Sequence, residues 1–245
     1  MCRTVLVLML GAAGMVRAQS PVVVSAATSL TDVLQQLGAA HERRSEDRVI
    51  LNFGASNTLA RQIAAGARVD LFVSADEAQM DAVAAYIDPS SRVELVSNQL
   101  AIAVTDDRPR RFSSARELAD PAVRRIALGD PAAVPAGVYA KAYLEKLGVW
   151  ADIAPKVVPS GSVRLALAAV ENGAADAAIV YKTDIATARR VREAFVVPAA
   201  DGPRIVYPAA VVRGGRNAAG ARRFLQFLTS REAAAVFERA GFLRP

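Results

Sequence analysis

The chain is poor in the residue types on which several common functional sites depend. It has one cysteine and one histidine in 245 residues, and aromatic residues make up only 6%. A disulfide framework needs paired cysteines, and the usual zinc and copper sites need clusters of Cys and His, so neither is expected. The formal charge of +6 comes from arginines scattered among acidic residues. With so few aromatics, this pattern argues against a nucleic-acid partner.

A run of apolar residues that could be taken for a membrane anchor occurs only at the N-terminus. Arg3 precedes the apolar run 5–10, small residues follow, and Val16-Arg17-Ala18 has small residues at the third and first positions before a cut after Ala18. This pattern is typical of a signal peptide, and its apolar run is too short to span a bilayer as a permanent helix. It predicts an exported chain of about 227 residues that starts at Gln19, with a net charge of about +4. We therefore expect the protein in the periplasm.

Short β-type runs alternate with helical runs along the rest of the chain, which is typical of α/β folds with parallel sheets covered by helices on both faces. The predicted strands are 22–24, 49–53, 71–73, 93–96, 99–105, 125–128, 156–158, 177–181 and 205–212, and the predicted helices are 28–43, 58–65, 76–86, 138–147, 162–172, 218–228 and 231–240.

Two stretches interrupt this alternation. The strands 93–96 and 99–105 follow each other with no helix between them, and the strand 205–212 contains Pro208. These breaks predict two lobes, with the chain crossing near Gln99 and returning near Gly202. We expect residues 19–98 and 203–245 to form lobe I and residues 99–202 to form lobe II. In such folds a ligand binds at the carboxyl ends of the strands, in the cleft between the lobes.

Four predicted strand-to-helix turns are rich in small and hydroxyl residues. They are 26–32, 53–58, 134–138 and 159–164, and the first pairs Ser29 with Asp32 in a spacing like that of a capping box. Helix N-termini leave backbone N–H groups without partners and carry partial positive charge. Several of them converging on one point form an anion site. Each turn alone could equally be an ordinary helix cap.

Particular segments then point to one family. The chain resembles the periplasmic molybdate-binding proteins of ABC importers, which are type II periplasmic solute-binding proteins, over nearly its whole mature length. The segments that carry the resemblance are AATSLTD (26–32), SNTLARQI (56–63), ARVDLFVSAD (67–76), GDP (129–131), VPAGVYAK (134–141), IVY (179–181) and GF (241–242), of which the second and fifth are the most particular.

The resemblance implies a two-lobed fold with mixed, mostly parallel sheets flanked by helices and a ligand cleft between the lobes. It also implies that a tetrahedral oxyanion, molybdate or tungstate, is held by two serine hydroxyls, two backbone N–H groups and one phenol. In this sequence these are Ser29 and Ser56, Ala136 and Val163, and Tyr181. No cofactor is implied, and the partner is the membrane permease of an ABC transporter. The resemblance further implies a monomeric carrier rather than an enzyme.

Neutral donors suit an anion that carries no proton. A deprotonated oxyanion offers only acceptors, whereas hydrogen phosphate brings its own O–H and needs an acceptor from the protein. Sulfate is also fully deprotonated, so a carrier of a sulfate-like oxyanion stays an alternative. A ferric iron carrier is another, although such carriers present paired tyrosines and here Tyr139 or Tyr143 is expected to be partly in the core.

A periplasmic hydrolase is the least favoured alternative. It would depend on His41, which we expect on the solvated face of a helix, and no GxSxG-like turn is present. Arg164 is also expected on a solvated helix face. Asp130 and Asp184 lie near the predicted site segments, and because a bare carboxylate would repel an anion, we expect them to cap helices or to pair at the hinge.

Overall fold

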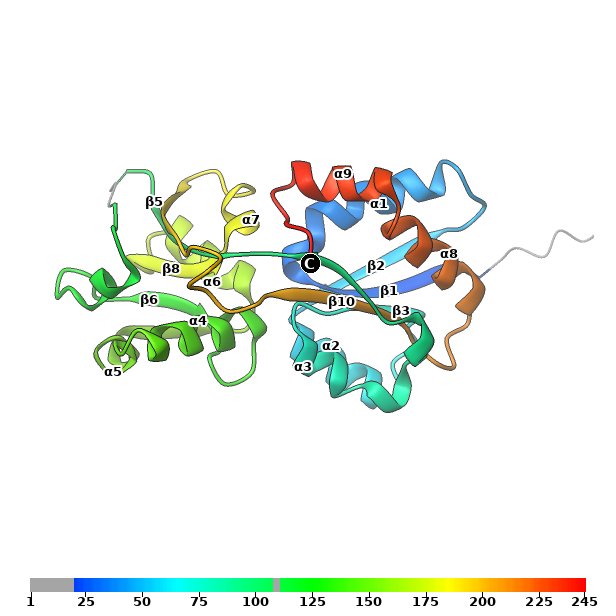
Figure 1. The fold of residues 1–245 in the computed structure, drawn as a ribbon, viewed down its shortest axis with the longest axis horizontal. Helices are drawn as coiled ribbons and strands as arrows, with labels where there is room; N and C mark the ends of the chain where they lie inside the picture. Colours follow the sequence, from blue (N-terminus) through cyan, green and yellow to red (C-terminus); the bar gives the residue numbers. More distant parts are fainter. Residues whose placement is uncertain (1–19, 108–110) are drawn as a thin grey trace, which may run out of the picture.

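The computed structural model describes residues 20–107 and 111–245. The predicted signal peptide, 1–18, lies outside the described residues. Within the described part, no helix is long and apolar enough to cross a membrane. Figure 1 shows two lobes side by side, connected by extended segments that run from one to the other.

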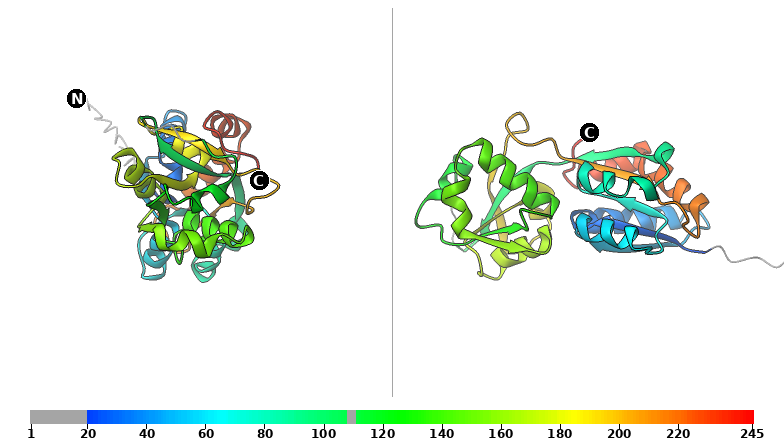
Figure 2. Two further views of the ribbon diagram at one scale, coloured as in Figure 1. Left: turned by 90° about the vertical axis from the view of Figure 1, so that its left-hand side faces the viewer. Right: turned by 90° about the horizontal axis from the view of Figure 1, so that it is seen from below.

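Lobe I is built around a five-stranded mixed sheet in which β1 is parallel to β2 and β3, whereas β10 is antiparallel to β3 and β4. Helices cover both faces of this sheet (Figures 1 and 2). The strands are β1 (Val22–Ala27), β2 (Val49–Gly54), β3 (Leu71–Val73), β4 (Val93–Ser97) and β10 (Val206–Val211), in the order β2-β1-β3-β10-β4, and the helices are η1 (Thr28–Leu30), α1 (Thr31–Glu42), α2 (Ser56–Ala64), α3 (Glu77–Asp81), η2 (Ala84–Tyr86), η3 (Pro89–Ser91), α8 (Ala218–Leu228) and α9 (Arg231–Arg239), where η denotes a 3₁₀ helix.

Lobe II repeats this plan. Its sheet pairs β6 in parallel with β7 and β8, and β5 antiparallel with β8 and β9. The strands are β5 (Leu100–Thr105), β6 (Ile126–Gly129), β7 (Val157–Ser160), β8 (Ala177–Tyr181) and β9 (Val191–Val196), in the order β7-β6-β8-β5-β9, and the helices are η4 (Ala115–Ala119), α4 (Pro135–Lys146), α5 (Trp150–Ile153), η5 (Ala154–Lys156), α6 (Val163–Glu171) and α7 (Lys182–Ile185).

The predicted two-lobed fold with mixed sheets flanked by helices is confirmed, although parallel and antiparallel strand pairs are equally numerous among the described strands rather than mostly parallel. The reason is the connectivity. β5 enters lobe II directly from β4, and β10 returns directly from lobe II, so each runs against its neighbours. We propose the division 19–98 with 203–245 against 99–202, which agrees with the strands that each sheet contains.

Most predicted elements are present with shifted ends, and a few were missed. The predicted helix 76–86 is two short helices, α3 and η2, and the strand β9 was not predicted. β9 carries Arg192 and Glu193 in its middle, and it lies at the edge of the sheet, where charged side chains reach water. Its sequence VREAFV therefore lacks the continuous apolar run of the inner strand β8.

Gly137 allows helix α4 to begin close to strand β6, next to Ala136, one of the residues predicted to bind the ligand. Gly137, in the first turn of α4, lies so near the end of β6 that a Cβ built on it would be 1.8 Å from the carbonyl oxygen of Gly129. A larger residue at Gly137 would push the start of α4 away from the strand. Glycine is therefore required for α4 to begin directly above the carboxyl end of β6.

Candidate oxyanion-binding site

The five residues predicted to bind the ligand line one small cavity between the lobes. The cavity measures about 10 Å³, and Ser29, Ser56, Ala136, Val163 and Tyr181 are each at most 4% exposed. None of the described residues that line this space carries a charged side chain. The lining residues are Ala27, Thr28, Ser29, Gly54, Ala55, Ser56, Ala75, Val134, Pro135, Ala136, Val163 and Tyr181.

Both lobes contribute, and each contributes from the carboxyl end of a strand. In lobe I, Ser29 follows β1 and Ser56 follows β2. In lobe II, Ala136 follows β6, Val163 follows β7 and Tyr181 ends β8. The cavity therefore lies where the sequence predicted a ligand cleft, between the lobes and at the strand ends that face each other. The role of the five residues as ligand donors stays a prediction.

Two helices begin at the cavity without a side-chain cap. The N-cap residue of α2 is Ala55 and that of α4 is Val134, and neither side chain accepts a hydrogen bond from its helix. The first N–H groups of a helix have no partner within the helix. At these two ends, the side-chain oxygens that usually satisfy them are missing, so the N–H groups and the positive end of each helix dipole remain for a ligand.

The first turn of α4 singles out the N–H group of Ala136. Pro135 has no N–H, and the N–H groups of Gly137 and Val138 donate to the carbonyl oxygen of Val134 at 2.9 Å. Ala136 is the remaining donor of this turn, and the residue itself lines the cavity. This local geometry agrees with the role that the resemblance assigns to it.

α6 does have a side-chain cap, yet the cap leaves its first N–H group available. The Ser162 hydroxyl accepts from the N–H of Leu165 at 3.3 Å, and the Ser162 carbonyl accepts from that of Ala166. Val163 is the first residue of the helix and lines the cavity, so its N–H is not used by the cap.

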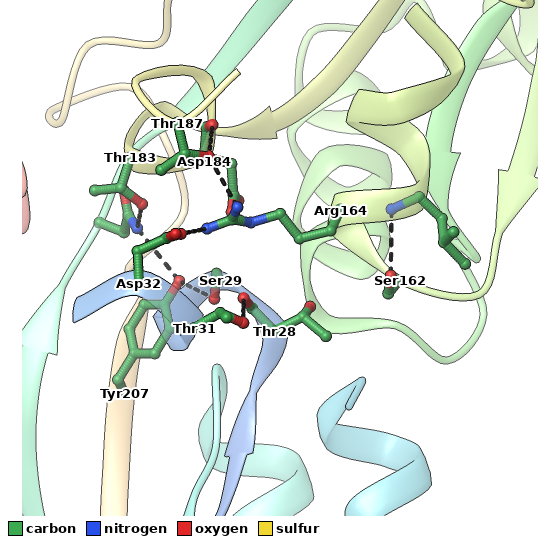
Figure 3. Close-up of polar contacts among 12 residues, drawn as sticks. Thr28, Ser29, Thr31, Asp32, Ser162, Arg164, Thr183, Asp184, Thr187 and Tyr207 are labelled. Carbon is green, nitrogen blue, oxygen red and sulfur yellow. Dashed lines mark hydrogen bonds and ion pairs between the residues drawn. The ribbon is translucent and has the colours of Figure 1, made fainter. Parts of the chain in front are cut away.

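A buried chain of hydrogen bonds orients the hydroxyl of Ser29. The Asn98 side chain donates from Nδ2 to the Tyr207 hydroxyl oxygen at 3.2 Å, and this hydroxyl lies 3.1 Å from Oγ of Ser29. Asn98 Nδ2 also donates to Thr183 Oγ1. Because Tyr207 already accepts from Asn98, its own proton can be donated to Ser29, and the proton of Ser29 is then free to point into the cavity. Figure 3 shows Tyr207 and Ser29 facing each other in this way.

The hydroxyl of Ser56 is oriented by the backbone instead. Its Oγ accepts from the N–H of Ala75 at 2.9 Å. A hydroxyl has a single proton, and here the oxygen is occupied as an acceptor, so the proton can be donated to a ligand. Both serines are thus arranged as donors toward the same space.

The hydroxyl of Tyr181 is buried and has no hydrogen-bond partner among the described residues. The residue is 1% exposed, lines the cavity, and packs against the ring of Tyr207 with centroids 5.8 Å apart. Burial raises the pKa of Tyr181 well above its ordinary value of 10, so the phenol keeps its proton at neutral pH. An unpaired buried hydroxyl costs about 1–3 kcal/mol, which a ligand in this cavity could recover.

Two expectations about polar groups of lobe I were wrong. Ser29 and Asp32 do not form a capping box, because η1 intervenes and α1 has no side-chain cap. His41 is 4% exposed rather than solvated. Its Nε2 lies 3.0 Å from Oδ2 of Asp47, and its ring packs against Phe224 and Phe227.

Arg164 is not on a solvated face, because its guanidinium is paired with carboxylates on either side of it. Asp184 pairs with this arginine within lobe II rather than at the hinge. Asp130 accepts from the N–H of Ala132 in the turn before α4, so it stabilises that turn. The expectation that Tyr139 or Tyr143 lies partly in the core is confirmed, since Tyr143 is 5% exposed and Tyr139 also packs against the core.

The residues that sequence reasoning missed are those that support the site. Asn98 and Tyr207 lie on the two segments that cross between the lobes, and each gives only a weak signal in the sequence. Among the described residues there is also no group of three or more His, Cys, Asp or Glu that could hold a metal ion.

Two α/β lobes joined by two crossing segments, with a small cavity between them that is lined by uncharged residues, define a solute-binding protein of the two-lobed type. The chain belongs to the family of bacterial extracellular solute-binding proteins, whose family model matches residues 22–243. The resemblance inferred from the sequence is therefore confirmed.

Individual relatives carry the comparison further. The chain is 37% identical to the molybdate-binding protein ModA of Escherichia coli (strain K12), over 91% of this chain and 89% of the relative. It is 34% identical to the ModA of Haemophilus influenzae, over 92% of this chain and 91% of the relative. Among solved structures, the periplasmic molybdate-binding protein of Azotobacter vinelandii superposes with a TM-score of 0.83 at 25% identity, over 91% of this chain and 99% of the other.

Proposed function

We propose that this protein captures molybdate, and also tungstate, between its two lobes and delivers it to the membrane permease of an ABC importer. The observation that carries the proposal is the unpaired hydroxyl of Tyr181, buried at a cavity where two oriented serine hydroxyls and uncapped helix N-termini meet. The ligand class follows from this donor set, and the particular oxyanion from the similarity to molybdate-binding proteins.

The donor set fits a doubly charged oxyanion energetically. A buried dianion loses hydration worth tens of kcal/mol, which must be replaced by well-aimed donors. Each hydrogen bond to a charged group contributes about 1.5–3 kcal/mol net, and each helix N-terminus about 0.3–2 kcal/mol. Ser29, Ser56 and Tyr181 with the N–H groups of Ala136 and Val163 supply donors from both lobes, so the ligand stabilises the closed form.

The same donor set supports selection by protonation state. At neutral pH, hydrogen phosphate carries a proton that would require an acceptor, and no carboxylate lines the cavity among the described residues. We therefore infer that phosphate is rejected. Tungstate has nearly the size of molybdate and the same charge, so we infer that it binds comparably.

The alternatives fit this cavity less well. A ferric iron site needs anionic oxygen ligands. One neutral phenol does not supply them. A hydrolase would need a general base at the cavity, and His41 is buried in lobe I against Asp47, outside the cavity lining. A sulfate-like oxyanion satisfies the same donors as molybdate and is the stronger rival, since the two differ in size rather than in charge.

Isothermal titration calorimetry with molybdate, tungstate, sulfate and phosphate at one pH tests the proposal. We expect molybdate and tungstate to bind tightly, sulfate much more weakly, and phosphate not at all. Tight binding of sulfate with weak binding of molybdate would move the assignment to the rival oxyanion. Hydrolysis of a chromogenic ester by the purified protein would support the enzymatic alternative instead.

The remaining parts of the proposal concern where the protein works. Membership of an extracellular solute-binding family supports export, and we propose the periplasm as the compartment and a cut after Ala18. We propose that the carrier is a monomer and that the lobes close by a hinge motion of the crossing segments near Gln99 and Ile205. We propose no resident cofactor and no nucleic-acid partner.

A further inference from the structure

A pair of charged side chains joins the two lobes beside the cavity. Arg164, on α6 of lobe II, donates from Nη2 to Oδ2 of Asp32, on α1 of lobe I, at 2.6 Å. Figure 3 shows the guanidinium lying between Asp32 on one side and Asp184 on the other. The donors of the proposed site do not include either side chain, so this contact is separate from ligand binding itself.

Within its own lobe, Arg164 is firmly anchored. Its Nε donates to Oδ1 of Asp184 at 2.6 Å, and its Nη1 donates to Oγ1 of Thr187 at 2.8 Å. The Asp184 side chain is fully buried and that of Arg164 is 26% exposed, whereas that of Asp32 is 59% exposed. Opening of the lobes would leave the anchored contacts in place and break only the contact with Asp32.

The position of the pair links it to the proposed site on both sides. Arg164 directly follows Val163, the first residue of α6, and Asp32 lies three residues after Ser29. The contact therefore joins the two segments that present a backbone donor and a hydroxyl donor from opposite lobes. Resting on the proposed function, we propose that the Asp32–Arg164 pair is a clasp that holds the lobes closed and slows the release of the bound oxyanion.

The clasp acts through closure and not through attraction of the anion. Two carboxylates face the single guanidinium, so the positive charge of Arg164 is already compensated. Asp32 itself carries a negative charge near a doubly negative ligand and repels it. Simple electrostatics thus predicts that removing the charge of Asp32 strengthens binding, whereas the clasp predicts faster release. The two explanations differ in sign.

Asp32→Asn is the decisive substitution because the amide has the shape of the carboxylate without its charge. A partly exposed ion pair of this kind supports an increase of about 1.5- to 5-fold in the dissociation rate of molybdate, with the association rate changed much less. Stopped-flow displacement measures both rates. High salt should speed release from the parent protein and have a smaller effect on the variant.

Two further variants complete the comparison. Glu232→Gln removes a similarly exposed carboxylate, whose partner Arg44 lies in the same lobe, so its release rate should equal that of the parent. Asp32→Glu keeps the charge and should restore slow release at least in part. A rate for Asp32→Asn that equals the parent's, or slower release, overturns the clasp.

The distance between the lobes gives a readout that does not depend on the ligand's identity. Spin labels at exposed positions of α2 and α4, Gln62 and Ala142, report the distance between the lobes by pulsed electron resonance. Asp32→Asn should move the distribution toward longer distances, and Glu232→Gln should not. If the parent binds no molybdate, the proposed function fails, while the distances still decide the clasp. Identical distributions in parent and Asp32→Asn overturn it.

Discussion

Replacing Tyr181 by phenylalanine tests whether its hydroxyl binds the ligand without stabilising the ligand-free fold. In the closed structure this hydroxyl is buried and has no partner among the described residues. It should therefore contribute to ligand binding while contributing nothing to the stability of the ligand-free fold. Tyr181→Phe keeps the ring, and with it the contact with Tyr207 at 5.8 Å between centroids.

The expected magnitudes follow from the energy of single hydrogen bonds. A bond to a charged group contributes about 1.5–3 kcal/mol, and each 1.4 kcal/mol is about tenfold in affinity. Tyr181→Phe should therefore weaken molybdate binding by about 10- to 150-fold. Removing an unpaired buried hydroxyl relieves a cost of about 1–3 kcal/mol, reduced by any opening of the lobes, so the ligand-free variant should be as stable as the parent or more stable.

Tyr207→Phe is the matched control. The Tyr207 hydroxyl is also buried in an aromatic cluster, but it contacts both Ser29 and Asn98. Its removal leaves the Ser29 hydroxyl without this contact and takes from Asn98 one of the two acceptors of its Nδ2, so this variant should lose stability even without ligand, by about 1–3 kcal/mol. Calorimetric titration measures the affinities, and denaturant unfolding without ligand measures the stabilities.

The opposite pattern would refute the reasoning. If Tyr181→Phe binds molybdate as tightly as the parent, its hydroxyl does not donate to the ligand. If the variant instead loses more than about 1 kcal/mol of ligand-free stability, the hydroxyl has a partner within the protein, and the assignment of an unsatisfied donor fails.

Three other predictions test the remaining parts of the site and of lobe I. Ser29→Ala and Ser56→Ala should each cost about 1–3 kcal/mol of molybdate affinity in calorimetry, and unchanged affinity in both would contradict their roles. Val163→Pro removes the N–H group at the first helical position, where proline is tolerated, so affinity should fall by about 1.5–3 kcal/mol. Val163→Ala, which changes the side chain but keeps the N–H, should bind nearly as the parent does. A hydrogen bond from Arg223 holds the pKa of Asp47 below its ordinary value of 3.8, so the pair stabilises the fold above that pH and its contribution is lost as pH falls further. Asp47→Asn should cost about 1–3 kcal/mol of unfolding free energy at pH 7, with a difference from the parent that shrinks below about pH 4, and a constant difference would contradict the ion-pair explanation.

The parts of the site that could be predicted from the sequence are local. Small and hydroxyl residues mark the helix starts that follow the strands, and Ser29, Ser56, Ala136 and Val163 each lie in the first turn of such a helix. The resemblance then assigned a role to each of them and to Tyr181. Because these turns follow strands that end at the same edge of each sheet, local patterns were enough to expect them in one cleft.

The parts that could not be predicted depend on packing between distant segments. His41 follows the polar pattern of an exposed helix end, but α8 brings Phe224 and Phe227 over it, from more than 180 residues further along the chain. Arg164 looks like a solvated residue of α6, but Asp184 of the same lobe and Asp32 of the other lobe both pair with it.

The supporting role of Tyr207 has the same origin. Its strand, β10, was predicted, but its contact with Ser29 spans 178 residues. Whether a polar side chain is buried or hydrogen-bonded depends on tertiary contacts, so the spacing of polar and apolar residues along the chain does not reveal it.

Anomalous diffraction at the molybdenum edge, from crystals of the protein grown with molybdate, tests the central claim most directly. The account predicts one strong molybdenum peak in the cavity between the lobes, with oxygens in hydrogen-bond distance of the Ser29, Ser56 and Tyr181 hydroxyls and of the Ala136 and Val163 N–H groups. A peak outside this cavity, or oxygens held by lysine or arginine side chains instead of these neutral donors, would contradict it.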